Sequence, residues 1–198
     1  MNTTQSVRSR LKNLFVNPPE GSRRWGGSEE ARIRREVFAE HLYGKKELTP
    51  ADHSELIEEV LHEALEVLPS ADSSSYISWL VQLGATFGYT SASARLLIQL
   101  VLRLGHHTHE ELVAQLDKFQ MPLAISTFVF VAKNRKLLLS NEFGDKGDAM
   151  ARKAVWALGK LERDQNSAEA NAGLRELAEF KDRKVARYAT SMLKRGEC

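Results

Sequence analysis

Two segments within the last fifty residues carry the same short pattern of basic, small and apolar side chains. The pattern recurs after 35 residues, first as Arg152, Ala154, Ala157, Leu158 and Lys160, then as Arg187, Ala189, Met192, Leu193 and Arg195. Asp148 and Asp182 begin the two copies, and a further helical pattern lies between them. A helical unit that repeats at about 35 to 45 residues predicts helices stacked side by side as a solenoid.

The segment Asp148 to Leu161 resembles the second helix of a HEAT repeat. That family favours an aspartate, then an arginine, then alanines and leucines that face the neighbouring hairpin. Asp182 to Leu193 resembles it again, and Arg95 to Arg103 repeats part of it. The resemblance covers about a quarter of the chain and implies antiparallel helical hairpins stacked as a short α-solenoid, a fold that works mostly by offering a surface.

Start and stop signals divide the chain into about nine or ten helices joined by short connections. The clearest start is Thr49 to Asp52, with threonine at the N-cap, proline at the first helical position and an acid at the third. Thr108 to Glu111 predicts a capping box, and Gly105 predicts that the preceding helix ends at Leu104. The stretch Leu123 to Leu139 has β propensity, but a lone strand has no partner, so we expect a buried helix. The sequence predicts an all-α fold.

Composition indicates a soluble folded protein, with 42% apolar and 27% charged residues. The single cysteine, Cys198, allows no intrachain disulfide and suits a reducing compartment. No apolar run approaches the length that spans a bilayer. We therefore expect a cytoplasmic protein with a basic N-terminal helix and loop arm over residues 1–27 and a helical-repeat domain over residues 28–198.

The N-terminal segment offers an alternative location. Residues 1–19 contain no acid, and Val7, Leu11, Leu14 and Phe15 fall on one face of a helix. A basic amphipathic N-terminus rich in serine and threonine is typical of an organelle transit peptide or of a membrane-surface helix. We expect instead an ordered helix that caps the repeats or clasps a partner.

Charge is unevenly distributed, although the net charge is only +2. Residues 1–46 and 95–198 each carry an excess of five basic side chains, whereas residues 47–94 carry eight acids and no lysine or arginine. Five of these acids share one predicted helix: Glu55, Glu58, Glu59, Glu63 and Glu66. Three interpretations compete: a solvated face, pairing with the chain's own basic arm around Arg23, Arg24 and Arg32 to Arg35, or a docking surface for a basic partner.

Tryptophan and arginine are the residue types most enriched among interface anchors. The run Arg23, Arg24 and Trp25 is flanked by glycines and is the best local candidate for a contact motif. Its alternative is a Trp25 ring folded back onto the helices. Trp79 and Trp156 lie within apolar helical patterns, and we expect both in the core.

Catalytic and metal signatures are weak. The histidines of His106 to His109 would need ligands from separate turns to hold a metal, and histidine also suits a helix C-terminus. Glu59 and His62 match half of a di-iron motif that has no second half in this chain. Gly144 to Asp148 lacks the spacing of a phosphate-binding loop. We expect no catalytic residue, metal or cofactor.

The expected function is therefore non-catalytic binding of another macromolecule, as by a scaffold, an adaptor, an immunity-type protein or a subunit of a larger assembly. The expected partner is a protein, which would contact the acidic helix and the Arg23 to Trp25 loop. The alternative is nucleic-acid binding with steep salt dependence, through the basic C-terminal residues Arg152, Lys153, Arg183, Lys184 and Arg187.

Overall fold

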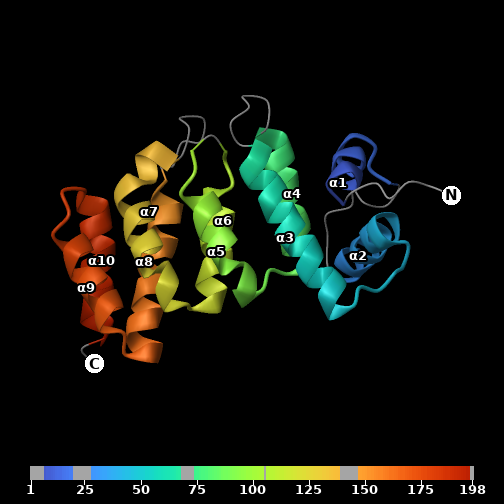
Figure 1. Cartoon of the computed structure of the whole chain (residues 1–198). Coiled ribbons are helices and arrows are strands. Elements are labelled where there is room, and N and C mark those ends of the chain that lie inside the picture. The colour runs from blue at the N-terminus through green and yellow to red at the C-terminus, as the bar shows by residue number, and fades with distance from the viewer. Residues whose placement is uncertain (1–6, 20–27, 68–73, 105, 139–146, 197–198) are drawn as a thin grey trace. The chain divides into compact units, whose positions relative to one another are not determined.

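The computed structural model describes residues 7–19, 28–67, 74–104, 106–138 and 147–196. Within these ranges the chain forms ten α-helices and two short 3-10 helices, without a strand (Figure 1). The predicted all-α fold is confirmed for these residues, and none of their helices combines the length and apolar character needed to cross a membrane. Contacts divide the chain into two compact units, residues 1–93 (unit 1) and residues 94–198 (unit 2).

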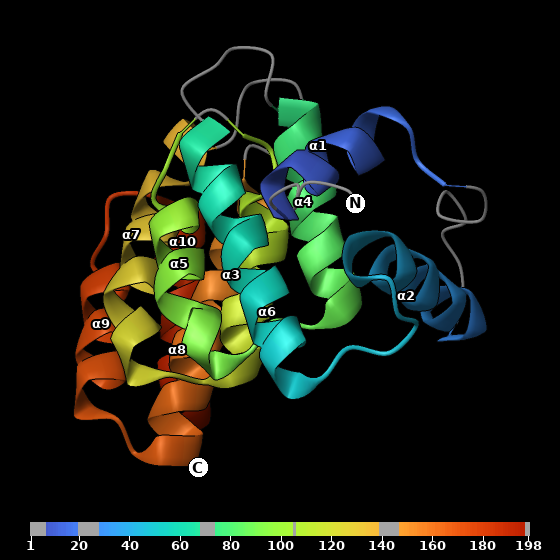
Figure 2. The same ribbon diagram turned by 45° about the vertical axis from the view of Figure 1, so that its right-hand side comes forward.

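Unit 1 contains four α-helices and one 3-10 turn: α1 (Val7–Val16), α2 (Ser28–Tyr43), α3 (Pro50–Val67), α4 (Ser74–Phe87) and η1 (Ser91–Ser93). Helices α3 and α4 are antiparallel, since His53 near the start of α3 bonds through Nε2 to the carbonyl oxygen of Phe87, the last residue of α4, at 3.2 Å. Fully buried apolar residues hold the pair together, among them Leu56, Leu61, Ile77 and Leu80. Helices α1 and α2 also pack within this unit, α1 against α3 and α2 against α4 (Figure 2).

The predicted start of α3 is confirmed by reciprocal hydrogen bonds. The Thr49 backbone N–H donates to Asp52 Oδ2 at 2.8 Å, and the Asp52 N–H donates to Thr49 Oγ1 at 3.2 Å. Lys45 also binds this carboxylate. The bonds from Lys45 and then from Thr49 lower the pKa of Asp52 to about 2. Asp52 is therefore ionised at neutral pH, as the capping role requires.

Unit 2 contains six α-helices and one 3-10 turn: α5 (Ala94–Val101), α6 (His109–Phe119), η2 (Pro122–Ala124), α7 (Ile125–Leu138), α8 (Asp148–Gln165), α9 (Ala168–Ala178) and α10 (Arg183–Gly196). Within the ambiguous stretch Leu123 to Leu139, residues 125–138 form the helix α7, as predicted, and Phe128 and Val131 of this helix are fully buried. The N-cap of α9 is Ser167, whose hydroxyl accepts from the Ala170 N–H at 3.2 Å.

Helices two apart along unit 2 run in the same direction. Lys184 near the start of α10 binds Asp148 at the start of α8, and Met192 further along α10 covers Gly159 of α8. These two pairs are separated by 36 and 33 residues, close to the 35-residue period of the sequence pattern. The pattern therefore corresponds to neighbouring helices in matching register.

The same direction holds for two further pairs in unit 2. Lys153 and Lys160 of α8 bind Glu110 and Asp117 of α6, both at a separation of 43 residues. Gly173 of α9 lies against Val129 of α7, and one turn further on Glu176 binds Lys133. Helix α9 is antiparallel to α8, because Asn171 near its start donates to Glu162 near the end of α8 at 3.4 Å.

One predicted helix end and one predicted capping motif are wrong, and one histidine pair accounts for both. Helix α5 ends at Val101 instead of Leu104, because the carbonyl oxygens of Leu100 and Arg103 accept hydrogen bonds from histidine rings. The predicted capping box is not formed either. The Thr108 hydroxyl lies 2.8 Å from Nδ1 of His106 and makes no capping bond to α6.

The prediction that Trp156 belongs to the core is wrong. Its side chain is 48% exposed, because the turns of α8 bury the positions on either side of it.

We expect Trp156→Ala to lower the free energy of unfolding by less than about 1 kcal/mol. Trp79→Ala should cost about 2 kcal/mol, because its ring packs against Phe38 and Tyr76. Urea unfolding of both variants tests the difference, and equal losses would contradict it.

Candidate functional site

The basic side of α1 lies on the acidic helix α3. Arg8 Nε donates to Glu59 Oε2 at 2.8 Å, and its Nη1 contacts Glu66. These hydrogen bonds raise the pKa of Arg8 above its already high ordinary value. Lys12 Nζ lies 3.3 Å from Oε1 of Glu63, a residue that is only 2% exposed. Three of the five predicted acidic contact residues are thus paired inside unit 1.

The apolar side of α1 is buried at the predicted spacing, through Val7, Leu11 and Leu14. An aromatic group holds the end of this helix. The ring centroid of Phe15 lies 4.9 Å from that of Tyr76 and 5.7 Å from that of Trp79, both on α4. Burial raises the pKa of Tyr76, and the nearby Glu63 raises it further. Helix α1 is therefore seated by ion pairs along one side and by apolar contacts along the other.

The remaining acidic contact residues, Glu55 and Glu58, are exposed, and neither forms an ion pair with another described residue. The predicted contact motif lies outside the described residues: Arg23, Arg24 and Trp25. Arg32 of α2 binds Glu36 on its own helix. The ion pairs of Glu59, Glu63 and Glu66 within unit 1 are therefore made by α1.

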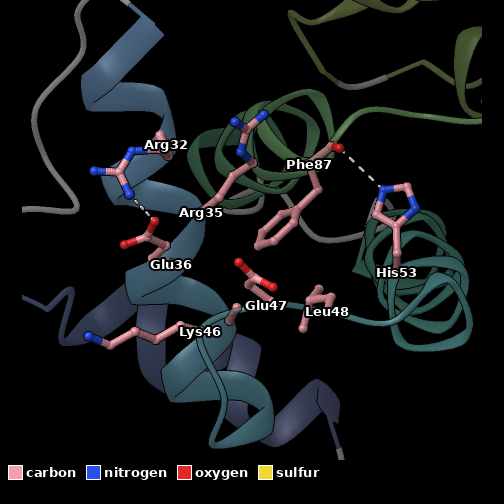
Figure 3. Close-up of a pocket in the computed structure, with 9 residues that line it drawn as sticks. Arg32, Arg35, Glu36, Lys46, Glu47, Leu48, His53 and Phe87 are labelled. Atoms are coloured by element: carbon pink, nitrogen blue, oxygen red, sulfur yellow. Dashed lines mark hydrogen bonds and ion pairs between the residues drawn. The ribbon is translucent and has the colours of Figure 1, made fainter.

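A pocket of about 500 Å³ opens elsewhere in unit 1 (Figure 3). Figure 3 shows the ring of Phe87 and the carboxylate of Glu47 facing its interior. The Phe87 carbonyl oxygen accepts a hydrogen bond from His53 Nε2, so this nitrogen already has a partner. Arg35 and Lys46 also line the pocket, so both signs of charge are present and neither dominates. No local sequence pattern groups these residues, because they come from separate elements.

The predicted nucleic-acid residues lie in unit 2 on α8 and α10. Lys153 binds Glu110 and Lys184 binds Asp148, so these two charges are partly compensated. The other three residues are exposed and pair with no carboxylate of the described chain: Arg152, Arg183 and Arg187. The guanidinium of Arg152 stacks 5.8 Å from the exposed Trp156 ring, and that of Arg187 lies 5.9 Å from the Tyr188 ring.

Arg135 joins the two aspartates that begin the repeated pattern. Its side chain is buried; Nε and Nη2 donate to Asp182 Oδ2 at 3.1 and 2.9 Å, and Nη1 contacts Asp148. Burial acts to raise the pKa of Asp182, but hydrogen bonds from Arg135 and from the Lys184 N–H outweigh burial and lower it. No local sequence pattern singles out Arg135, because Lys133 and Lys136 lie beside it on the same helix.

The imidazole rings of His106 and His109 form hydrogen bonds to backbone carbonyl oxygens. The rings of His106 and His109 are buried and stacked, with centroids 3.9 Å apart and planes 8° from parallel. His106 Nε2 donates to the Leu100 carbonyl at 2.9 Å, and His109 Nε2 donates to the Arg103 carbonyl at 2.8 Å. Burial lowers the pKa of both rings, that of His109 to about 4. The two rings thus close the junction between α5 and α6 in their neutral form.

Comparison of the chain with known protein families, with curated proteins and with solved structures found no match.

Proposed function

We propose that this protein is a non-catalytic protein-binding module that docks a basic amphipathic helix on the acidic face of α3. The observation that carries the proposal is the seat of α1 within unit 1. A helix with apolar residues on one side and Arg8 and Lys12 on the other already fits that face. Helix-in-groove recognition uses this combination of spaced apolar anchors and flanking charges.

The contacts of α1 define the chemistry of the partner. Its apolar residues must recur at the spacing of Val7, Leu11 and Leu14, and a large ring must reach the aromatic group that receives Phe15. Basic side chains must follow the first and second apolar positions, as Arg8 and Lys12 do in α1. A partner that also reaches Glu55 and Glu58 gains ion pairs that α1 does not make.

Helix α1, which already occupies the acidic face of α3, sets a threshold for the binding of a partner helix. The ion pairs of Arg8 and Lys12 are partly open to solvent, and such pairs contribute about 1 kcal/mol or less each. Because α1 is tethered to unit 1, however, it competes at an effective concentration of the order of millimolar. A partner therefore displaces α1 only if it makes more contacts than α1 does, and this requirement makes binding selective.

The fold-level part of the proposal is that unit 2 is a short HEAT-like stack of helical hairpins. Support comes from α6, α8 and α10, which run in the same direction, and from α9, which runs antiparallel to α8. A rigid stack of this kind holds its surface in place, so little ordering entropy is lost when a partner binds. Scaffold, adaptor, immunity-type protein and assembly subunit are all roles that this proposal includes.

The proposal is tested with a labelled peptide that has the sequence of residues 5–19. The charge-reversal variant Arg8→Glu/Lys12→Glu weakens the resident helix, and we expect this variant to bind the peptide at least about tenfold more tightly than the unaltered chain. Adding Glu59→Lys and Glu66→Lys to the variant should abolish binding. Adding Glu169→Lys and Glu179→Lys, which change the same charge in unit 2, should leave binding intact.

Two outcomes would overturn the proposal. One is equal affinity of the peptide for the unaltered chain and for the Arg8→Glu/Lys12→Glu variant. The other is equal loss of binding in the two four-residue variants, since that result would show a response to net charge alone. Circular dichroism of each variant checks that the helical content is unchanged.

A second candidate function is nucleic-acid binding by α8 and α10. Two stacked pairs favour it, Arg152 on Trp156 and Arg187 on Tyr188, because their helices run in the same direction in matching register. Titration with labelled duplex at two salt concentrations tests this candidate. A steep loss of affinity with salt, and a loss in Arg183→Ala/Arg187→Ala, would support it. Binding that is absent at low salt would exclude it.

A further inference from the structure

A strongly basic pocket of about 570 Å³ opens in unit 2, where the end of α7 meets the turn between α9 and α10. We propose that this pocket binds a diphosphate group, a role that lies outside the proposed docking of a helix on unit 1. Its volume falls within the range of about 300 to 1,000 Å³ that is typical of small-ligand sites. Six of its lining residues are cationic: Lys133, Arg135, Lys136, Lys181, Arg183 and Lys184.

Half of these cations are already compensated. Lys133 binds Glu176, Lys184 binds Asp148, and Arg135 binds both Asp148 and Asp182. Asp182 is the only acid among the described residues that line the pocket, and the Arg135 guanidinium covers its Oδ2 atom through two hydrogen bonds. The negative charge of Asp182 is therefore compensated by the buried Arg135 side chain.

The other half has no carboxylate partner in the described part of the chain. Lys136, Lys181 and Arg183 are exposed and form no ion pair with a described residue. Among the described residues, six cations against the three carboxylates of Asp182, Asp148 and Glu176 leave a surplus of three positive charges. A ligand with two to three negative charges would balance this surplus, as a diphosphate does. Lysine and arginine donate strong, charge-assisted hydrogen bonds to phosphate oxygens.

The backbone around the pocket is set in place by specific contacts. Asn134 leaves the helical conformation, with φ −107° and ψ 19°, and so kinks α7 just before Arg135 and Lys136. Gly147, with φ +77°, packs against the carbonyl of Arg135, where a Cβ atom would lie 2.7 Å from the oxygen. These two features fix the end of α7 beside the start of α8, and they hold Lys136 close to Arg183 and Lys181 around one opening.

Apolar side chains form the remaining wall. Leu137 is 61% exposed at the rim, and the Phe180 ring lines the pocket with Lys133 Nζ 5.9 Å from its centroid. A diphosphate group can come from a nucleoside diphosphate, whose base would contact this wall, or from inorganic pyrophosphate, which would not use it. Both sources present the same diphosphate group, and a comparison of their affinities tells them apart.

Isothermal titration of the full chain tests the pocket with four probes: ADP, pyrophosphate, AMP and adenosine. We expect ADP or pyrophosphate to bind with a micromolar dissociation constant, AMP to bind at least about tenfold more weakly because it carries less charge, and adenosine not to bind. Tighter binding of ADP than of pyrophosphate assigns the nucleoside diphosphate as the source, whereas equal or tighter binding of pyrophosphate assigns the free diphosphate.

The matched variants each remove three positive charges. Lys136→Gln/Lys181→Gln/Arg183→Gln removes the pocket cations that pair with no described carboxylate, and we expect it to weaken binding at least about tenfold. Lys118→Gln/Arg163→Gln/Arg195→Gln removes exposed cations outside the pocket and should leave affinity unchanged within about twofold at physiological salt. Failure of every diphosphate to bind the folded, unaltered chain would overturn the proposal. Equal losses in the two triple variants would overturn it as well.

Discussion

Replacing Arg135 by methionine is expected to lower the free energy of unfolding of unit 2 by about 3 kcal/mol. Arg135 is 5% exposed, and its guanidinium is the shared partner of Asp148 and Asp182. Methionine fills the space but removes the charge, so Asp182 loses two hydrogen bonds and both carboxylates lose their buried cation. Lys184 still binds Asp148, which limits the loss. Urea denaturation followed by circular dichroism measures the change.

A double-mutant cycle separates the ion pair from packing. Adding Asp182→Asn to Arg135→Met removes one uncompensated carboxylate, so the double variant should regain about 1 kcal/mol relative to Arg135→Met. Arg135→Lys keeps the charge but loses the forked donors, and its stability should lie between those of the unaltered chain and Arg135→Met. A loss below about 1 kcal/mol for Arg135→Met would show that the carboxylates do not depend on this residue.

Acidification below pH 6.5 is expected to destabilise unit 2 through His109. The pKa of this ring is about 4 in the folded protein and about 6.5 in the unfolded chain. Between these values the unfolded chain binds more protons, so the free energy of unfolding falls as the pH falls through this window. The contribution is fully present above pH 7 and lost near pH 4. It amounts to about 3 kcal/mol.

The physical cause lies at one ring atom. His109 Nε2 donates to the Arg103 carbonyl, and the buried Nδ1 makes no hydrogen bond in the neutral ring. A proton on Nδ1 would be buried away from water and would face the stacked His106 ring, and hydrogen bonds to backbone offset only part of this cost. His109→Gln should remove most of this pH dependence between pH 7 and pH 4.5, and His62→Gln, which alters an exposed histidine, should leave it unchanged. An equal slope in all three proteins would contradict this assignment.

Local signals in the sequence predicted those parts of the fold that depend on neighbouring residues. Thr49 and Asp52 are three residues apart, and their reciprocal hydrogen bonds follow from that spacing. The capping box at Thr108 failed for an equally local reason. The His106 ring lies close enough to bind the hydroxyl, and no capping pattern records such a competitor.

The sequence pattern does not predict contacts between residues that are far apart in the chain. The excess of acids on α3 was evident, but their partner Arg8 is 51 residues away from Glu59, and a charge pattern does not specify which cation folds back. Trp156 was assigned to the core because apolar residues surround it in sequence. Helix α8 instead turns Arg152 and Trp156 outward together. Arg135 was missed as a junction because its two aspartates lie 13 and 47 residues away.

Amide hydrogen exchange across residues 7–16 tests the central claim most directly. When the Arg8→Glu/Lys12→Glu variant, whose own α1 is weakened, is saturated with the basic peptide of residues 5–19, the peptide should take the place of α1 on α3. Amides of α1 should then exchange at least about tenfold faster, while those of α3 and α4 keep their protection. Unchanged protection of α1 at saturation would show that no helix competes for this face and would contradict the account.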